Sequence, residues 1–265
     1  MTSTAEKLEN LKRLLQEFAR VGVCFSGGVD STLLLKIAVD VLGGVNVAAF
    51  LADTPTMPRA ELHSARELAA GMNVTLVEVL THELDEPLYA ANPADRCYYC
   101  KHIIFGALQT RAHELGFTVL LDGGNYDDLQ DFRPGHHAVM ELGVRSPLME
   151  VGLTKREIRE LSCRLGLPTA TKPAMACLAT RIPTGEPVTR TVLARIEQAE
   201  QILLAAGFRQ LRVRDCNGGR DARIEIEQRD FAKVADETLR NGVVSELHAL
   251  GYRQIVLDLK PLERA

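Results

Sequence analysis

The sequence predicts an α/β protein with a doubly wound parallel sheet, followed by a small C-terminal α+β domain. Two observations predict the sheet: β-rich runs alternate with segments of helical periodicity through the first 167 residues, and a glycine-rich turn follows the first run. A third predicts the second domain, because strand pairs between helices replace this alternation after residue 187. We therefore divide the chain into a first domain (1–167), a linker or loop (168–187) and a C-terminal domain (188–265).

The first domain begins with an expected helix over residues 5–20, whose apolar side chains recur at helical spacing. Runs rich in branched and aromatic residues then mark the strands, and the intervening segments have helical patterns. The expected strands are 21–25, 45–52, 74–80 and 118–122, and the expected helices are a segment from residue 33, 58–71 and 98–115. We expect a fifth strand at 145–148, then a helix capped by Thr154 with Glu157 at capping-box spacing.

Residues 168–187 break this rhythm with four prolines and Gly185, which indicates a linker or an active-site loop. The pattern beyond it has a helix at about 188–206 and two strands joined by the Gly218-Gly219 turn. The remaining expected elements are the strands 210–214, 222–227 and 254–259 and a helix at about 230–250.

The composition is that of a globular protein, with 265 residues, 46% hydrophobic and 25% charged. The net charge of −4 argues against a nucleic-acid partner, since such proteins usually carry a basic face. No apolar run reaches the roughly 18 residues of a membrane helix, and the polar N-terminal segment lacks the pattern of a secretory signal. We expect a cytoplasmic protein, in which the presence of six cysteines indicates metal or catalytic chemistry rather than a disulfide framework.

The segment Ser-Gly-Gly-Val-Asp-Ser, residues 26–31, lies between the first strand and the following helix. Its small residues permit a tight turn whose amides, with the helix N-terminus, form a nest for an anion. The segment is not a Walker A loop, because no Gly-Lys-Ser/Thr follows at the required spacing. An ordinary glycine turn is a poorer explanation, because all six positions match the motif at a junction between a strand and a helix. The residues expected to bind ATP phosphates are Ser26, Gly27, Gly28, Asp30, Ser31, Thr32 and, after the fourth strand, Gly123. Asp30 is also the expected magnesium ligand.

Cys97 and Cys100 form a CxxC motif where a loop enters a helix. This motif alone is compatible with zinc, a redox pair or an iron–sulfur cluster. A zinc site lacks further paired ligands in this sequence, whereas Cys177 as a third thiolate would suit a 4Fe–4S cluster with one iron free of protein ligands. Cys24 and Cys163 are expected to be buried apolar residues, and Cys216 to be incidental.

Six segments in this order carry a family resemblance: SGGVDSTLLLK, RCYYCK, LDGGNYDDLQDFRPG, ACLATR, PTGEPVT and LRVRD. The chain resembles the LarE family of the ATP pyrophosphatase (PP-loop) superfamily, whose fold is of the adenine nucleotide alpha hydrolase-like type. The resemblance covers both domains. It implies an ATP-dependent sulfur transferase that adenylates the carboxylates of pyridinium-3,5-biscarboxylic acid mononucleotide and converts them to thiocarboxylates for the nickel-pincer nucleotide cofactor. It also implies a homo-oligomer, a hexamer, and leaves room for a sulfur donor protein.

One branch of that family has only the cysteine that matches Cys177 and sacrifices its sulfur. This sequence departs from that branch because Cys97 and Cys100 are present. The departure favours the branch that carries a cluster, since a labile sulfide can be replenished and a sacrificed cysteine gives one turnover.

The implied substrate has two carboxylates and a phosphate, so its site needs cations. Arg212 and Arg214 are two apart on an expected strand and therefore share a face, where each guanidinium can clamp an oxyanion. A third candidate for binding the anionic substrate is Arg181, four residues after Cys177 in the sequence, with Thr180 beside it. The further site residues implied by the resemblance are Tyr98, Lys101, Glu200, Glu225 and Asp230.

Three other functions stay open at this point. A tRNA thiolation enzyme of the same superfamily also combines a PP-loop with three cysteines, although the acidic charge argues against it. An amidating synthetase would have no use for the cysteine trio. A regulatory nucleotide-binding protein with a structural cluster would show no turnover.

Overall fold

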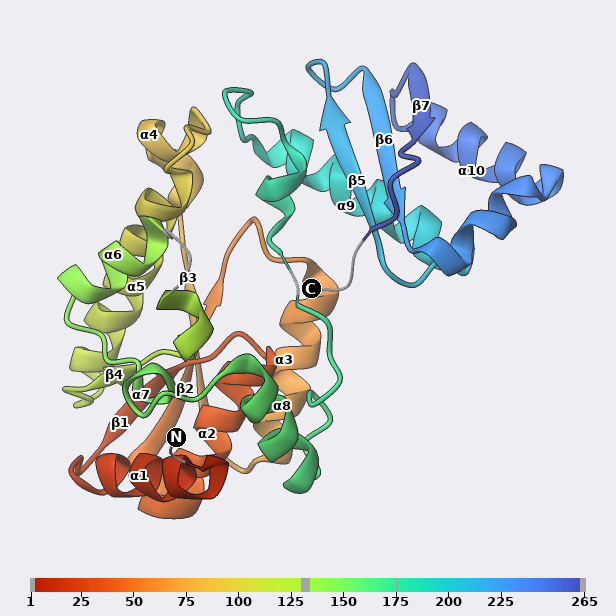
Figure 1. Cartoon of the computed structure of the whole chain (residues 1–265). Helices are drawn as coiled ribbons and strands as arrows, with labels where there is room; N and C mark the ends of the chain where they lie inside the picture. The colour runs from red at the N-terminus through yellow and green to blue at the C-terminus, as the bar shows by residue number, and fades with distance from the viewer. Residues whose placement is uncertain (1–2, 130–133, 175, 263–265) are drawn as a thin grey trace. The chain divides into compact units, whose positions relative to one another are not determined.

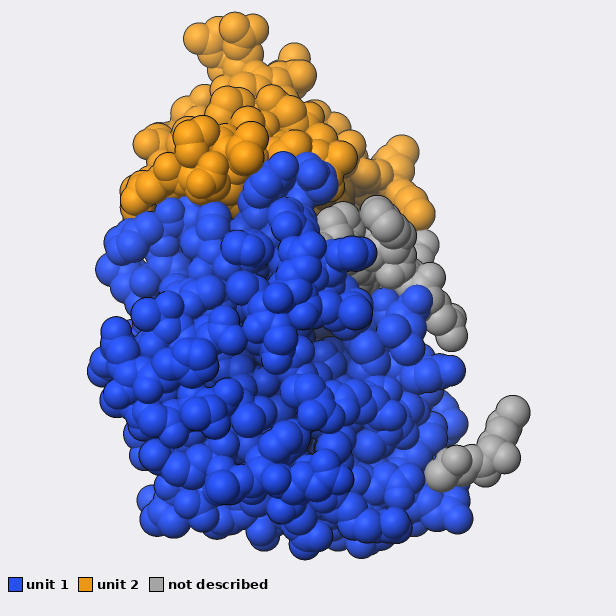
Figure 2. Space-filling view, turned by 90° about the vertical axis from the view of Figure 1, so that its left-hand side faces the viewer, with its two compact units in different colours: residues 1–83, 95–175 blue, residues 84–94, 176–265 orange. Residues whose placement is uncertain are grey.

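The computed structural model describes residues 3–129, 134–174 and 176–262. The chain forms two compact units, which Figure 2 shows in separate colours. Unit 1 comprises Met1–Glu83 and Asp95–Met175, and unit 2 comprises Leu84–Ala94 and Ala176–Ala265. Thus the segment 84–94, which our sequence division places in the first domain, lies with the C-terminal residues, and most of 168–175 lies with unit 1.

Unit 1 carries the larger sheet (Figure 1). Its elements are α1 (Thr4–Gln16), β1 (Val21–Cys24), α2 (Val29–Leu42), η1 (Gly44–Asn46), β2 (Val47–Asp53), α3 (Arg59–Gly71), β3 (Thr75–Leu80), α5 (Arg96–Glu114), β4 (Leu120–Leu121), η3 (Tyr126–Leu129), α6 (Pro134–Glu141), α7 (Pro147–Glu150) and α8 (Lys155–Arg164). The short turn η2 (Glu83–Asp85) spans the first boundary with unit 2.

Among the described residues this sheet has the order β3-β2-β1-β4, and every pairing is parallel. Both faces are covered, which is the doubly wound arrangement that the alternating pattern predicts. Ala49 and Leu51 of β2 pack into the core under α1, α2, α3 and α8, whereas Ala48 and Phe50 pack against α5 and α6. Parallel pairing gathers the carboxyl ends of these strands at one edge, and the glycine-rich turn follows β1 there.

The prediction of a fifth strand at 145–148 is wrong. Only Arg145 forms a bridge, parallel to Leu121, and Pro147 then occupies the first turn of the short helix α7. The reason is that proline has no N–H for a ladder hydrogen bond, whereas its fixed φ suits a helix start.

Unit 2 is an α+β layer. Its elements are α4 (Pro87–Ala90), η4 (Leu178–Arg181), α9 (Arg190–Ala205), β5 (Leu211–Cys216), β6 (Asp221–Ile226), η5 (Gln228–Ala235), α10 (Glu237–Ala249) and β7 (Gln254–Leu257). The β5–β6 hairpin is antiparallel, and β7 pairs parallel to β6. Leu203 of α9 and Leu247 of α10 pack with Val213 and Ile224 in one core, which leaves the opposite sheet face to polar side chains. The expected helix at 230–250 is divided, because Asp236 caps a new helix.

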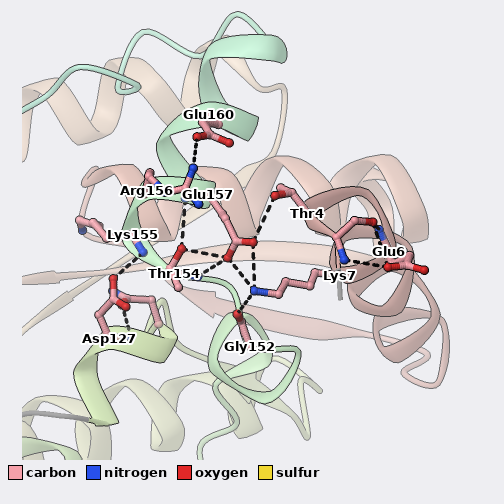
Figure 3. Close-up of polar contacts among 12 residues, drawn as sticks. Thr4, Glu6, Lys7, Asp127, Gly152, Thr154, Lys155, Arg156, Glu157 and Glu160 are labelled. Atoms are coloured by element: carbon pink, nitrogen blue, oxygen red, sulfur yellow. Dashed lines mark hydrogen bonds and ion pairs between the residues drawn. The ribbon is translucent and has the colours of Figure 1, made fainter. Parts of the chain in front are cut away.

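A polar cluster ties the start of α8 to α1 (Figure 3). The carboxylate of Glu157 accepts hydrogen bonds from Lys7 Nζ at 2.8 Å, from the Thr154 amide at 2.9 Å and from Thr4 Oγ1 at 3.1 Å. Thr154 and Glu157 form the capping box that the sequence predicts. Burial by itself would raise the pKa of Glu157, but the hydrogen bonds from Lys7, Thr154 and Thr4 outweigh it and lower the pKa to about 2.

Because the pKa of Glu157 is lowered in the folded protein, the free energy of unfolding depends on pH. Because the folded pKa lies below the unfolded value, the contribution is present above pH ~4.5 and is lost as the pH falls toward 2. We expect the free energy of unfolding of the wild type to drop by about 2 kcal/mol more between pH 6 and pH 3 than that of Glu157→Gln. Urea unfolding at both pH values measures this, with Glu160→Gln on the same helix as the control. Parallel losses in wild type and Glu157→Gln would contradict the assignment.

Candidate functional site

The turn between β1 and α2 has the backbone of an anion nest. Gly27 adopts φ = 68°, and a Cβ added there would lie 3.0 Å from the Cβ of Ala65 on α3. Gly28 is the N-cap of α2 and supplies no side-chain cap, so the first amides of the helix are available to a ligand. Ser26 Oγ and Ser31 Oγ lie 3.2 Å apart across the turn, and Ser31 Oγ also accepts from the Ser26 amide at 3.3 Å.

Gly123 lies directly against the first turn of α2. A Cβ on Gly123 would lie 2.9 Å from the Ser31 amide nitrogen and 3.2 Å from its Cα. The end of β4 therefore reaches the nest only because residue 123 has no side chain. The structure thus brings this predicted residue together with Ser31.

Asp30, in the first turn of α2, holds the one carboxylate that the sequence assigns to a metal. Its Oδ2 pairs with Lys155 Nζ, while its Oδ1 is buried and has no hydrogen-bond partner among the described residues. Thr32 Oγ1 is likewise buried without a partner in the described part of the chain. The amide of Lys155 donates to Asp127 Oδ2 at 2.8 Å (Figure 3). An orphaned carboxylate oxygen beside a phosphate nest suits a hard cation such as magnesium.

The nest opens into a cavity of about 540 Å³ within unit 1. Ser26, Asp30 and Ser31 line it from the nest, and Cys97 and Lys101 line it from α5. The volume is in the range of small-molecule sites. Predicted phosphate-binding residues and one predicted cluster ligand thus border the same space.

The CxxC motif lies in the first turns of α5, with Cys97 exposed and Cys100 half-buried. A spacing of three residues puts both thiols on one side of the helix. Among the described residues, no group of three or more histidine, cysteine, aspartate or glutamate side chains could hold a metal ion. Cys177 lies in unit 2, where it is half-buried and caps η4.

The remaining cysteines differ in part from expectation. Cys24 is half-buried and lines the cavity, and burial together with Asp122 raises the pKa of its thiol. The expected burial of Cys163 is wrong, since it is exposed on α8. The buried side of α8 is occupied by Ile158 and Leu161, and residue 163 turns away from it.

Arg181 is buried and holds the turn that carries Cys177. Its guanidinium pairs with Glu200, with Nε to Oε1 at 2.8 Å, and donates to the Ala176 carbonyl at 2.8 Å and the Cys177 carbonyl at 3.2 Å. Thr180 Oγ1 donates to the same Cys177 carbonyl at 2.7 Å. Four of the predicted site residues therefore form one cluster in unit 2.

The open face of the unit 2 sheet presents the two predicted arginines. Arg214 pairs with Glu225 and donates to the Thr180 carbonyl at 3.0 Å. The guanidinium of Arg212 has no hydrogen-bond or ion-pair partner within the described ranges, and burial together with the charges of Arg181 and Arg214 lowers its pKa. A half-buried guanidinium whose donors are not taken up by another side chain is suited to an anionic ligand.

Other residues implied by the resemblance have partners of their own. Tyr98 donates to Glu141 at 2.8 Å, and Asp230 pairs with Lys233 at 2.8 Å. Sequence reasoning missed two lysines at the nest, Lys155 on Asp30 and Lys172, whose Nζ donates to the Gly27 carbonyl at 3.0 Å. Both lie more than 120 residues from the loop in sequence, and no local motif points to them.

The sequence of this chain is similar to those of known proteins. The family model of asparagine synthase matches residues 8–123. An uncharacterized protein of Synechocystis sp. is 40% identical over 96% of this chain and 94% of its own. Pyridinium-3,5-bisthiocarboxylic acid mononucleotide synthase of Lactiplantibacillus plantarum is 35% identical over 98% of this chain and 92% of its own. A glutamine-hydrolyzing GMP synthase component of Methanosphaerula palustris is 32% identical over 72% of this chain and 65% of its own.

The parallel sheet, the nest and the match across it define the class, an ATP-using enzyme of the PP-loop type. Within that class the chain belongs to the LarE family, that of the L. plantarum synthase, and is an ATP-dependent sulfurtransferase. In the three described stretches of the chain, the helices all fall short of the length and apolar character needed to cross a membrane.

Proposed function

We propose that this enzyme converts the carboxylates of pyridinium-3,5-biscarboxylic acid mononucleotide to thiocarboxylates. The observation that carries the proposal is that the phosphate nest, Asp30 and Cys97 border the same cavity in unit 1. The synthase of L. plantarum, whose name specifies the bisthiocarboxylic product, supports the choice of substrate.

The first step is adenylation. A carboxylate oxygen attacks the α-phosphorus of ATP, the bond to the bridging oxygen breaks, and pyrophosphate leaves with the electron pair. The amides of the nest and the hydroxyls of Ser26 and Ser31 would take the departing phosphates. Asp30 would hold magnesium, which neutralises phosphate charge, and Lys155 would then turn from Asp30 to the phosphates.

The second step is sulfur transfer. A sulfur nucleophile attacks the carbonyl carbon of the acyl adenylate, and AMP leaves. We propose Cys97, Cys100 and Cys177 as the ligands of a 4Fe–4S cluster, since three thiolates are a fitting donor set. Such a cluster would supply the labile sulfide that acts as the sulfur nucleophile. Arg181, Thr180 and Glu200 would position the turn that presents Cys177.

The substrate would bind through its negative charges. Arg212, without a partner among the described residues, and Arg214, whose charge Glu225 partly neutralises, are the proposed ligands of its phosphate or carboxylates. Lys101, exposed and bordering the cavity, is a further cation that would bind the carboxylate that is to be adenylated. We also propose that the enzyme assembles as a homo-hexamer, receives sulfur from a donor protein and is located in the cytoplasm.

A turnover assay tests this function. Anaerobically reconstituted protein with Mg·ATP should release pyrophosphate only when the biscarboxylic mononucleotide is added, and should form thiocarboxylate only when a sulfur source is present. Product formed with ammonia in place of sulfide would instead indicate an amidating synthetase. Dependence on added tRNA would indicate a tRNA thiolation enzyme.

A further inference from the structure

Two lysines reach the nest from the segment that begins at α8. Lys155, the first residue of α8, pairs with Asp30 on the helix side of the nest. Lys172, eight residues after the end of α8, donates to the Gly27 carbonyl on the loop side. The two contacts differ in kind, because Lys155 neutralises a carboxylate that faces the cavity, whereas Lys172 holds the backbone of the turn itself.

The environment of Lys172 is built for one position of its ammonium group. Nζ also pairs with Glu61 Oε2 at 2.6 Å, and the two side chains are only 18% and 17% exposed. Glu61 lies in the first turn of α3, where the helix dipole favours a carboxylate. At this low exposure water screens the attraction between the two charges less than at the surface, and loss of either partner would leave a poorly solvated charge.

The backbone that carries Lys172 is fixed as well. Arg159 Nη1 donates to the carbonyls of Ala170 and Lys172, at 2.9 Å each, so α8 anchors the segment. The amide of Lys172 also closes a turn on the Thr169 carbonyl at 3.0 Å. The backbone of Lys172 is therefore held by contacts with Arg159 and Thr169, and none of these contacts involves the residues of the nest.

Gly27 is the residue of the nest that most needs support. Its φ of 68° lies in the left-handed region, and α3 packs on it through Ala65. Ala65 follows Glu61 by one helical turn, so both lie on the same face of α3. That face contacts Gly27 directly through Ala65 and indirectly through Glu61 and Lys172.

We infer that Lys172, fixed by Glu61, is a positioning residue for ATP that holds the Gly27 peptide so that the nest amides face the phosphates before ATP arrives. It acts through the backbone of Gly27 and not by touching the phosphates. Preorganisation of this kind raises affinity because the ligand need not order the loop. The inference rests on the proposed function only in taking ATP as the ligand of the nest.

The test uses Lys172→Met, Lys172→Arg and Glu61→Gln in the full chain, with Mg·ATP and inorganic pyrophosphate as the probes. Calorimetry should show that Lys172→Met binds both probes about tenfold or more weakly, since a charge-assisted hydrogen bond is lost. Lys172→Arg should recover most of the affinity, and Glu61→Gln should lose less because Nζ can still donate to Gly27. Lys36→Met is the control, since Lys36 pairs with Asp40 on the exposed side of α2.

Hydrogen exchange of the ligand-free protein separates positioning from direct contact. The amides of residues 27–31 should exchange faster in Lys172→Met than in the wild type and the control, while the amides of β1 and of the later turns of α2 keep their wild-type exchange rates. Weaker ATP binding with unchanged exchange at these amides would overturn the inference in favour of a direct phosphate contact. Unchanged ATP affinity in Lys172→Met would overturn it outright, whereas failure of sulfur transfer alone would count only against the proposed function.

Discussion

Replacement of Asp30 by asparagine is expected to lower kcat/KM for pyrophosphate release by at least ~100-fold. The carboxylate has one oxygen buried without a partner among the described residues and one oxygen on Lys155, so it is placed to exchange the ammonium group for magnesium. Asparagine keeps the size of the side chain but removes its charge, and Lys155 loses its ion-pair partner. Pyrophosphate release at substrate concentrations below KM, over a range of magnesium concentrations, measures the effect.

Asp40→Asn is the matched control for this variant. Asp40 lies on the same helix and pairs with Lys36 at 2.5 Å, but its side chain is 46% exposed. We expect wild-type rates for the control and a shifted magnesium requirement for Asp30→Asn alone. An Asp30→Asn enzyme with the wild-type magnesium dependence would rule out Asp30 as the metal ligand.

Serine at Cys97 is expected to abolish thiocarboxylate formation, by ~1,000-fold or more, while adenylation continues. The sulfur source and the activation of the acid are separate steps, and serine oxygen is a poor ligand for the iron of such a cluster. Iron–sulfur absorbance should be lost together with transfer. Pyrophosphate release, measured in parallel with thiocarboxylate, distinguishes the two steps.

Cys100→Ser and Cys177→Ser should behave as Cys97→Ser does. Cys163→Ser is the control, because that thiol is exposed on α8. If Cys97→Ser and Cys100→Ser both transfer sulfur at the wild-type rate, the cluster is not the sulfur source.

The fold of unit 1 could be predicted because its strands are short apolar runs with regular helical segments between them. The capping box of Thr154 and Glu157 was equally visible, since it is a local pattern. The residues around Pro147 were wrongly predicted as a strand, because the preference of proline for the first turn of a helix was not given enough weight. The position of residues 84–94 in unit 2 depends on contacts such as the Asn92 carbonyl with the Gly185 amide at 2.8 Å, which no local pattern reveals.

The nest could be predicted for the same reason as the fold, because its residues are consecutive. Gly123 was identified from its place at the end of a strand, and the structure places it against Ser31. Lys155 and Lys172 could not be identified from the sequence. Only the packing of α8 on α2 brings the first residue of α8, Lys155, and the segment after α8, which contains Lys172, to the glycine-rich loop. The roles proposed for the cysteines and arginines come from chemistry and family resemblance, and they remain predictions.

The most direct measurement is the mass of both product and protein after several turnovers with Mg·ATP, the biscarboxylic mononucleotide and sulfide. The account predicts a nucleotide in which sulfur has replaced carboxylate oxygen, with one AMP and one pyrophosphate released for each sulfur, and a protein of unchanged mass. Loss of the mass of hydrogen sulfide from Cys177 would contradict it, as would pyrophosphate release that does not depend on the biscarboxylic mononucleotide.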